Sequence, residues 1–172
     1  MQPPSMYSKE IVNHFRNPRN VGRIRKANGI GKAGNLLCGD LMKLYLNVGL
    51  SKKGLKVIKD IKFETFGCIV AISNSSMLTT MVKGRTIEEA AAITKDDLVQ
   101  KLGKPLPQIK LHCSLLAVDA LHEAIYDYYA KAQLPIPEEL EKEHQRIQKS
   151  LHTIEERHKE FVEFEEKLLK GP

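Results

Sequence analysis

The chain has 172 residues, of which 42% are hydrophobic and 28% charged, as is ordinary for one globular domain with an appendage. No stretch approaches the roughly 20 apolar residues that span a bilayer, and the N-terminus lacks the apolar core of a secretory signal, so a cytoplasmic protein without membrane association is expected. Three cysteines are too few for a disulfide framework, which leaves reduced thiols available to a metal.

The net charge of +6 is concentrated at the N-terminus. Residues 1–35 carry seven Lys and Arg against one acid, whereas residues 36–172 carry twenty of each sign. The N-terminal cations are not interleaved with aromatic side chains, and no nucleic-acid-binding motif accompanies them, so a nucleic-acid partner is not expected. A solvated segment and a surface for an acidic protein remain the two alternatives.

The N-terminal third predicts one helix and then a loop. Residues 7–16 suit a short helix that begins after Ser8 and has one apolar face. The following glycine-rich segment predicts flexible chain, so that Cys38 and Asp40 lie on a loop. The glycines of this segment are at positions 22, 29, 31 and 34.

Two strands are predicted next. Apolar and polar residues alternate over 41–48, which is the period of a half-buried strand. A turn at 51–54 leads to a partner strand over 56–66, which ends just before Cys68.

Helices are predicted through the rest of the chain to residue 133. Residues 72–82 have helical spacing, which puts Cys68 at a strand-to-helix junction. A further helix is expected to begin at Ser114, which would place Cys113 at its N-terminus. Two short helices between them have capping-box residues, Thr86 with Glu89 and Thr94 with Asp97.

The C-terminal part is predicted to be a separate helical extension. We divide the chain into a domain over 1–133 and an extension over 138–170, because prolines interrupt the chain at 135 and 137. In the extension an apolar residue recurs every seven positions, which leaves three alternatives: docking on its own domain, pairing with a second copy as a homodimer, or holding a partner protein. These residues are Leu140, Ile147, Ile154, Phe161 and Leu168.

The cysteines all lie at predicted boundaries of secondary structure, which favours a shared, partly open site over burial in the core. A helix N-terminus stabilises anions and so favours a thiolate at Cys113, and His112 can bind a metal or move a proton. Asp40, two residues after Cys38, adds a hard oxygen ligand that suits iron or zinc. Spacing alone leaves unrelated buried thiols as an equal alternative, since there is no C-x-x-C pair.

Three segments carry a stronger signal. They are Gly-Asn-Leu-Leu-Cys-Gly-Asp at 34–40, Phe-Gly-Cys at 66–68 followed by Ser-Asn-Ser-Ser at 73–76, and Leu-Pro-Gln-Ile-Lys-Leu-His-Cys-Ser at 106–114. In order and spacing they resemble the signatures of the IscU/NifU-type iron–sulfur cluster assembly scaffolds, and the resemblance runs from about residue 7 to 129. It implies an α+β fold, with a small antiparallel sheet of about three strands, helices packed on one face, and a long C-terminal helix added in this chain.

The resemblance also implies a function and a site. Cys38, Asp40, Cys68 and Cys113 would bind iron and a [2Fe-2S] cluster, with His112 as an alternate metal ligand. Cys113 would accept persulfide sulfur from a cysteine desulfurase, and the finished cluster would pass to apo iron–sulfur acceptor proteins. The protein would then be a scaffold and carrier, not an enzyme.

Several alternatives remain beside this interpretation. A zinc-bound sulfur acceptor of the same fold would hold Zn²⁺ with the same four residues. A hydrolase built on Cys113 and His112 is disfavoured, because neighbouring residues at a helix start seldom point at each other. Gln108 replaces a proline of the family's chaperone motif, which argues against recognition by an Hsp70-type chaperone. The remaining histidines are expected on surfaces or in packing: His14, His122, His144, His152 and His158.

Overall fold

The computed structural model describes residues 7–35, 39–103 and 111–170, with residues 161–170 as helical backbone only. Cys38 and Gln108, both named from the sequence, lie outside the described residues. In the described part of the chain no helix is both long and apolar enough to cross a bilayer.

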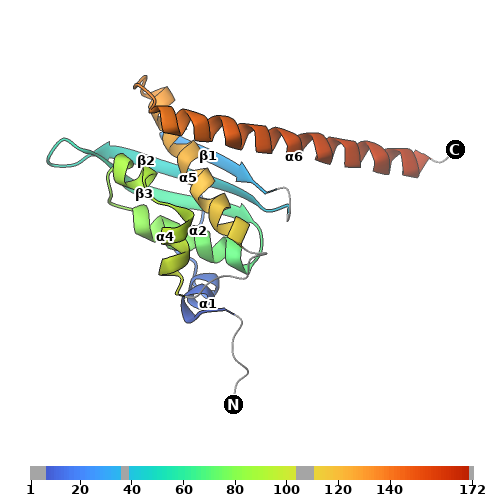
Figure 1. Cartoon of the computed structure of the whole chain (residues 1–172), viewed down its shortest axis with the longest axis horizontal. Coiled ribbons are helices and arrows are strands. Elements are labelled where there is room, and N and C mark those ends of the chain that lie inside the picture. The colour runs from blue at the N-terminus through green and yellow to red at the C-terminus, as the bar shows by residue number, and fades with distance from the viewer. Residues whose placement is uncertain (1–6, 36–38, 104–110, 171–172) are drawn as a thin grey trace, which may run out of the picture.

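A three-stranded antiparallel sheet organises the domain (Figure 1). Its order is β1 (Gly29–Gly34), β2 (Leu41–Leu50) and β3 (Lys56–Phe66). The structure confirms the two strands predicted from alternation, and β2 continues two residues beyond the prediction. The expectation of flexible chain over the glycine-rich segment is wrong for Gly29–Gly34, which pairs with β2 along its whole length.

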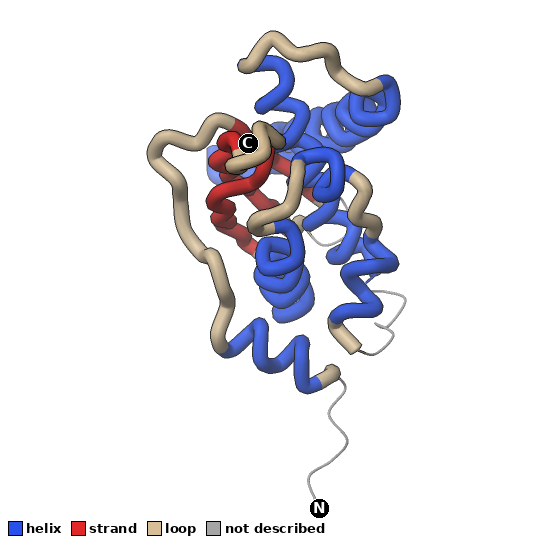
Figure 2. The backbone as a smooth tube through the Cα atoms, turned by 90° about the vertical axis from the view of Figure 1, so that its left-hand side faces the viewer, coloured by secondary structure: helices blue, strands red, loops and turns tan. Residues whose placement is uncertain are grey.

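The helices gather mainly on one face of the sheet, and a second view shows the strands toward one side of the molecule (Figure 2). The predicted α+β fold is therefore confirmed. Helix α1 begins after Ser8, whose hydroxyl accepts from the Ile11 amide, and both predicted capping boxes are present. The helices are α1 (Lys9–Arg16), α2 (Ile69–Val82), α3 (Ile87–Ala91), α4 (Lys95–Lys101), α5 (Leu111–Lys131) and α6 (Glu138–Lys170).

The core lies between the sheet and helices α2 and α5. Alternate residues of β2 are buried, among them Leu44 and Leu46, and Phe63 of β3 is buried beside them. Each such side chain contributes roughly 1.5–3 kcal/mol when it leaves water. Their partners on α5 include Leu121 and Ile125, both without exposed surface.

Helix α2 is buried on nearly every side although it contains a run of polar residues, 73–76. These side chains are hydrogen-bonded, as buried polar groups must be to avoid a large desolvation cost. The Ser73 hydroxyl donates to the Ile11 carbonyl of α1 at 2.7 Å, and Ser76 is 2.7 Å from Nδ1 of His14. The run therefore ties α2 to its neighbours and fixes the helix that begins at Cys68.

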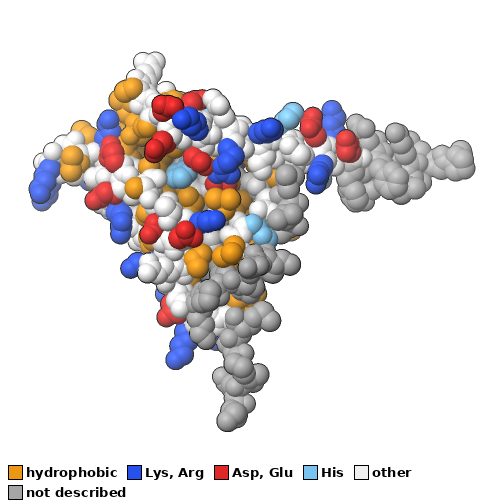
Figure 3. Space-filling model, viewed as in Figure 1, with side chains coloured by type: hydrophobic (Ala, Val, Ile, Leu, Met, Phe, Trp, Pro, Cys, Tyr) orange, Lys and Arg blue, Asp and Glu red, His pale blue; other side chains and the backbone are white. Residues whose placement is uncertain are grey.

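Helix α6 is packed on α5 in its first half and leaves the body in its second (Figure 1). Leu140 and Ile147 are buried, and the Arg146 guanidinium donates to the Asp119 carboxylate on α5. Each side chain from Glu155 to Glu160 is exposed, and the described charged groups of this part face solvent (Figure 3).

Candidate metal centre

Three predicted site residues converge at one end of the sheet. Asp40 directly precedes β2, Cys68 is the N-cap residue of α2, and Cys113 lies in the first turn of α5. The Cys68 and Cys113 sulfur atoms are 3.8 Å apart, and the Cys113 sulfur is 3.9 Å from Oδ2 of Asp40. One ligand atom from each residue lies within 4.8 Å of the others, and no other such group of three occurs among the residues that the structure describes.

These distances suit a shared ion better than a covalent bond between the sulfurs. A disulfide requires about 2.05 Å between its sulfur atoms, so Cys68 and Cys113 are reduced thiols. Two thiolates bound to one tetrahedral ion at about 2.3 Å each lie about 3.8 Å apart, and a thiolate and a carboxylate oxygen lie about 3.5 Å apart. The sulfur pair already has that separation, and the distance from the Cys113 sulfur to Oδ2 of Asp40 exceeds the ideal value by only a few tenths of an ångström.

The electrostatics of the site favour anionic ligands. The N-termini of α2 and α5 both meet there, and unpaired backbone amides at helix N-termini carry partial positive charge. Cys113 is buried with 1% of its surface exposed and Asp40 with 6%, whereas Cys68 is half-buried. A negative metal–thiolate unit would thus be held by two helix ends, with Cys68 on its more accessible side.

The residue before Cys68 lets the carboxylate approach. A Cβ built on Gly67 would lie 3.1 Å from the Asp40 carboxylate carbon and 2.8 Å from the Ala71 side chain. A larger residue at this position would collide with the Ala71 side chain and crowd the Asp40 carboxylate. The absence of a side chain at Gly67 is therefore part of the site's geometry.

The prediction that Ser114 begins the last helix of the domain is wrong, because α5 starts at Leu111 and takes Cys113 into its first turn. Ser114 instead donates to Oδ1 of Asn74 at 3.1 Å, and both side chains are fully buried. This bond links α5 to α2 next to the two cysteines. Sequence reasoning missed Asn74 and Ser114 as supports of the site, although the run 73–76 was noted as part of a motif.

His112 is not part of the group of three, and its Nε2 atom is buried with no hydrogen-bond partner among the described residues. Cys38 lies outside the described residues, but its flanking chain is fixed. The Asn35 amide donates to the Asp40 carbonyl at 3.0 Å, and the Gly39 amide to the Asn35 carbonyl at 2.9 Å. Asn35 and Gly39, the described residues on either side of residues 36–38, are therefore both tied to the chain next to Asp40.

The other histidines have the packing and surface contacts expected of them. Burial lowers the pKa of His14, which lies against Ser76. His144 stacks on Tyr126 with ring centroids 3.7 Å apart, and His152 is exposed.

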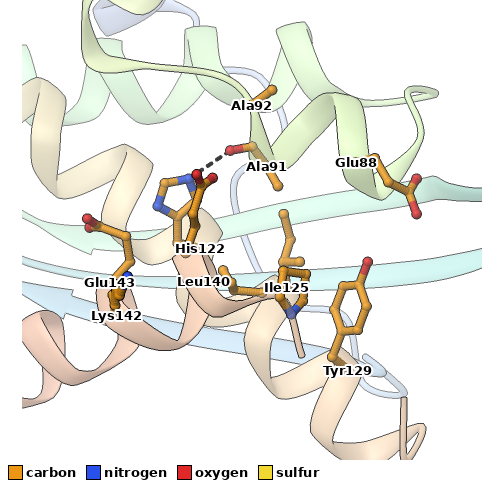
Figure 4. A pocket seen from close by; sticks show the side chains of 11 residues that line it. Glu88, Ala91, Ala92, His122, Ile125, Tyr129, Leu140, Lys142 and Glu143 are labelled. Carbon is orange, nitrogen blue, oxygen red and sulfur yellow. Dashed lines mark hydrogen bonds between the residues drawn. The ribbon is translucent and has the colours of Figure 1, made fainter. Parts of the chain in front are cut away.

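A separate pocket of about 530 Å³ opens between α3, α5 and α6 (Figure 4). Ile125 and Leu140 give it an apolar floor, and His122 bonds there to the Ala91 carbonyl at 3.1 Å. None of the predicted metal-binding residues lines it.

Comparison with known families agrees with this fold. The model of the NifU-like N terminal domain matches residues 6–134. A relative in Archaeoglobus fulgidus, named iron-sulfur cluster assembly scaffold protein IscU 1, is 51% identical over 144 residues, which are 80% of this chain and 90% of that protein. A relative in Schizosaccharomyces pombe, named iron sulfur cluster assembly protein 1, mitochondrial, is 47% identical over 134 residues, which are 76% of this chain and 67% of that protein.

Solved structures support the fold. A putative iron-sulfur cluster assembly scaffold protein for the SUF system from Fervidobacterium islandicum superposes with a TM-score of 0.56 at 24% identity, over 70% of this chain and 96% of that one. A NifU-like N-terminal protein from Brucella abortus gives a TM-score of 0.56 at 21% identity, over 73% of this chain and 96% of that one.

Proposed function

We propose, since the chain belongs to the family of NifU-like N-terminal domains, that it is a scaffold on which an iron–sulfur cluster is assembled and from which it is released. The observation that carries the proposal is the convergence of Asp40, Cys68 and Cys113 within 4.8 Å at two helix N-termini. The names of the relatives describe the function of those proteins. In this chain, the geometry of the three residues gives the same function a physical basis.

The proposed ligand set is Cys38, Asp40, Cys68 and Cys113, with His112 as an alternate ligand. One residue, Gly39, separates Cys38 from Asp40, and consecutive Cα atoms are about 3.8 Å apart, so the Cys38 thiol can reach the same centre. Three soft thiolates and one hard oxygen suit iron but hold it less firmly than four thiolates would. A carrier needs such an incomplete set, because its cluster must leave.

Assembly requires sulfur in a reduced form. We infer that a cysteine thiolate attacks the outer sulfur of a persulfide on a cysteine desulfurase, taking that sulfur and releasing the desulfurase thiolate. Cys113 is the proposed acceptor because it lies in the first turn of α5. Two sulfurs transferred in this way need four electrons to become two sulfides. Two ferrous ions supply one electron each and an external donor supplies the other two, which gives a unit of two ferric ions and two sulfides, [2Fe-2S], for an apo acceptor protein.

The exposure of the two cysteines favours Cys68 as a second candidate for the residue that accepts the sulfur. Cys113 is buried, whereas Cys68, 3.8 Å away, is half-buried and closer to solvent. The sulfur can therefore arrive on Cys68 and pass to Cys113 by the same exchange reaction. Mass spectrometry of Cys68→Ser and Cys113→Ser after reaction with a desulfurase would separate the two routes.

The rival with the same fold is a zinc-bound sulfur acceptor, since two thiolates and a carboxylate also fit a tetrahedral zinc ion. In either case the proposed organisation is a domain over 1–133 with a helical extension over 138–170, and the protein acts as a carrier with no catalytic turnover of its own.

Anaerobic reconstitution tests the proposal. The purified chain is incubated with ferrous iron, cysteine, a reductant and a cysteine desulfurase, then desalted and analysed for iron, sulfide, zinc and visible absorption. Equal iron and sulfide with charge-transfer colour support the scaffold. One zinc per chain and no colour would support the rival instead. Cys113→Ser should lose the cluster, whereas Asp96→Ala, which changes an exposed acid on α4, should keep it.

A further inference from the structure

An apolar shelf lies next to the metal centre on the sheet face opposite α5. The strand register puts Gly34, Leu41 and Phe66 in one row across the sheet. Leu41 is 47% exposed and Phe66 81%, which is unusual for large apolar side chains in adjacent positions. Leu151 and Ile154 of α6 pass beside Gly34, so α6 forms a wall of the groove, which has a volume of about 740 Å³. We call it the tip groove.

The next row of the sheet is positively charged. Lys32, Lys43 and Glu64 are paired across the three strands, so two lysines lie directly opposite each other. Like charges in such a pair destabilise a sheet. Glu64 cannot balance the charge of both lysines, because its carboxylate already binds Arg23 at 2.6 Å and the Tyr45 hydroxyl at 2.7 Å. Neither lysine forms an ion pair with any residue that the structure describes.

This combination selects the chemistry of an occupant. An apolar shelf beside two lysines that have no salt bridge to a described residue, one of them with its ammonium group 5.2 Å from the centre of the Tyr45 ring, fits a segment that has large apolar side chains on one side and carboxylates on the other. The chain itself contains such a segment at 160–166, Glu-Phe-Val-Glu-Phe-Glu-Glu, with four acids and no cation. At helical spacing Phe161 and Phe164 share a face with Leu168, and Glu163 with Glu166. We call residues 160–170 the tail.

The tail of the same molecule cannot fill the groove. Helix α6 is continuous from Glu138 to Lys170 and runs outward past Ile154 (Figure 1). With a rise of about 1.5 Å per residue, Phe161 is about 10 Å farther along the helix axis than Ile154. To return, the helix would have to break within a stretch that has neither proline nor glycine.

We propose that the tail of a second copy of this chain occupies the tip groove, with apolar residues on Leu41 and Phe66 and glutamates near Lys32 and Lys43. Because each chain has one tail and one groove, a two-fold axis satisfies both at once and closes the assembly as a dimer. This goes beyond scaffold function and stands on separate observations, so either can fail alone. The partner's tail would then lie beside Gly39 and Phe66, at the edge of the metal centre.

Mass in solution tests the proposal across a concentration series, by light scattering coupled to size exclusion. The full chain should have twice the mass of one chain, and deletion of 161–172 should halve it. Lys32→Glu/Lys43→Glu should also give the single-chain mass, as should Glu163→Lys/Glu166→Lys. Combining the two charge reversals in one chain should restore the dimer, which no merely structural damage would do. Circular dichroism checks that each variant is folded.

A charge reversal away from the groove serves as a matched control. Lys52→Glu/Lys53→Glu lies in the exposed turn between β2 and β3 and should leave the dimer intact. A single-chain mass for the full protein at every concentration would overturn the proposal. This holds even if the groove is then found to bind an acidic segment of a different protein. A dimer that survives deletion of 161–172, or one that the combined reversal fails to restore, would overturn it as well.

Discussion

The carboxylate of Asp40 differs from the two neighbouring thiols in its donor atom and in the packing that holds it in place. Oxygen is a harder donor than sulfur and suits a site whose ion or cluster must exchange. The side chain is buried, and its position depends on the bare backbone of Gly67, whose missing Cβ leaves it room. Asp40 is therefore held near the sulfurs by packing, without the strong bond that a fourth thiolate would give.

We predict that Asp40→Ala lengthens the lifetime of the bound cluster several-fold. The substitution removes the labile oxygen donor and closes a polar path to the iron. Decay of the charge-transfer absorption in air, and the rate of transfer to an apo ferredoxin, measure the effect. Asp96→Ala, with its exposed side chain on α4, is the control and should decay like the wild type. Equal or faster decay in Asp40→Ala would contradict the assigned role.

The site could be predicted from the sequence only through family signatures. The spacings of 30 residues from Cys38 to Cys68 and 45 from Cys68 to Cys113 do not indicate a common ion, since any fold could separate them. The fold brings Cys68 and Cys113 together because α2 and α5 pack side by side with their N-termini at the same end. The Asn74–Ser114 bond that helps to fix this arrangement is a contact between two helices, so no local pattern could reveal it.

At the scale of elements, strand β1 shows why one part of the fold escaped sequence analysis. Its sequence, Gly-Ile-Gly-Lys-Ala-Gly, has the composition of a loop. The glycines are explained by a neighbour remote in sequence: a Cβ on Gly31 would lie 2.1 Å from the Ala120 carbonyl oxygen and 2.4 Å from the Ala124 amide nitrogen of α5. By contrast β2 and β3 were predictable, because their alternation results from one buried face.

Gly31→Ala should therefore destabilise the domain strongly. The new methyl group meets backbone atoms of α5, which cannot move aside as a side chain can, and overpacking of this kind costs about 3 kcal/mol or more. Gly49→Ala in β2 is the matched control, since its Cβ would meet only the flexible Lys59 side chain at 3.1 Å, and we expect a loss of about 0.5 kcal/mol. Urea denaturation measures both, and similar losses would refute the close approach of α5 to β1.

For the molecule as a whole, the docking of α6 on α5 sets how the extension meets the domain. The apolar contacts of Leu140 and Ile147 agree with the heptad pattern, one of whose alternatives was docking on its own domain. The polar contacts were not predictable from that pattern. Arg146 binds Asp119, and His144 and Gln148 bind Glu123 at 2.9 and 2.6 Å, so two carboxylates of α5 are buried under α6.

These carboxylates make the stability of the whole molecule depend on pH in a defined direction. Burial raises the pKa of Glu123 above its usual value, although hydrogen bonds from His144 and Gln148 oppose the rise. Burial likewise raises the pKa of Asp119 beside Arg146. A carboxyl group whose pKa is higher in the folded than in the unfolded state contributes stability below its unfolded pKa, and loses this contribution as pH rises through the folded value.

Glu123→Gln removes that titration and so isolates its effect. The free energy of unfolding of the wild type, minus that of the variant, should be largest near pH 4.5 and decrease toward pH 8, because only the wild type must bury an ionised group at high pH. Urea unfolding at a series of pH values measures the difference. Thr153→Ala on α6 is the control: neither threonine nor alanine titrates, so the difference in free energy of unfolding between wild type and this variant should stay constant with pH. If the stability advantage of the wild type over Glu123→Gln instead grows with pH, burial of Glu123 does not control the docking of α6.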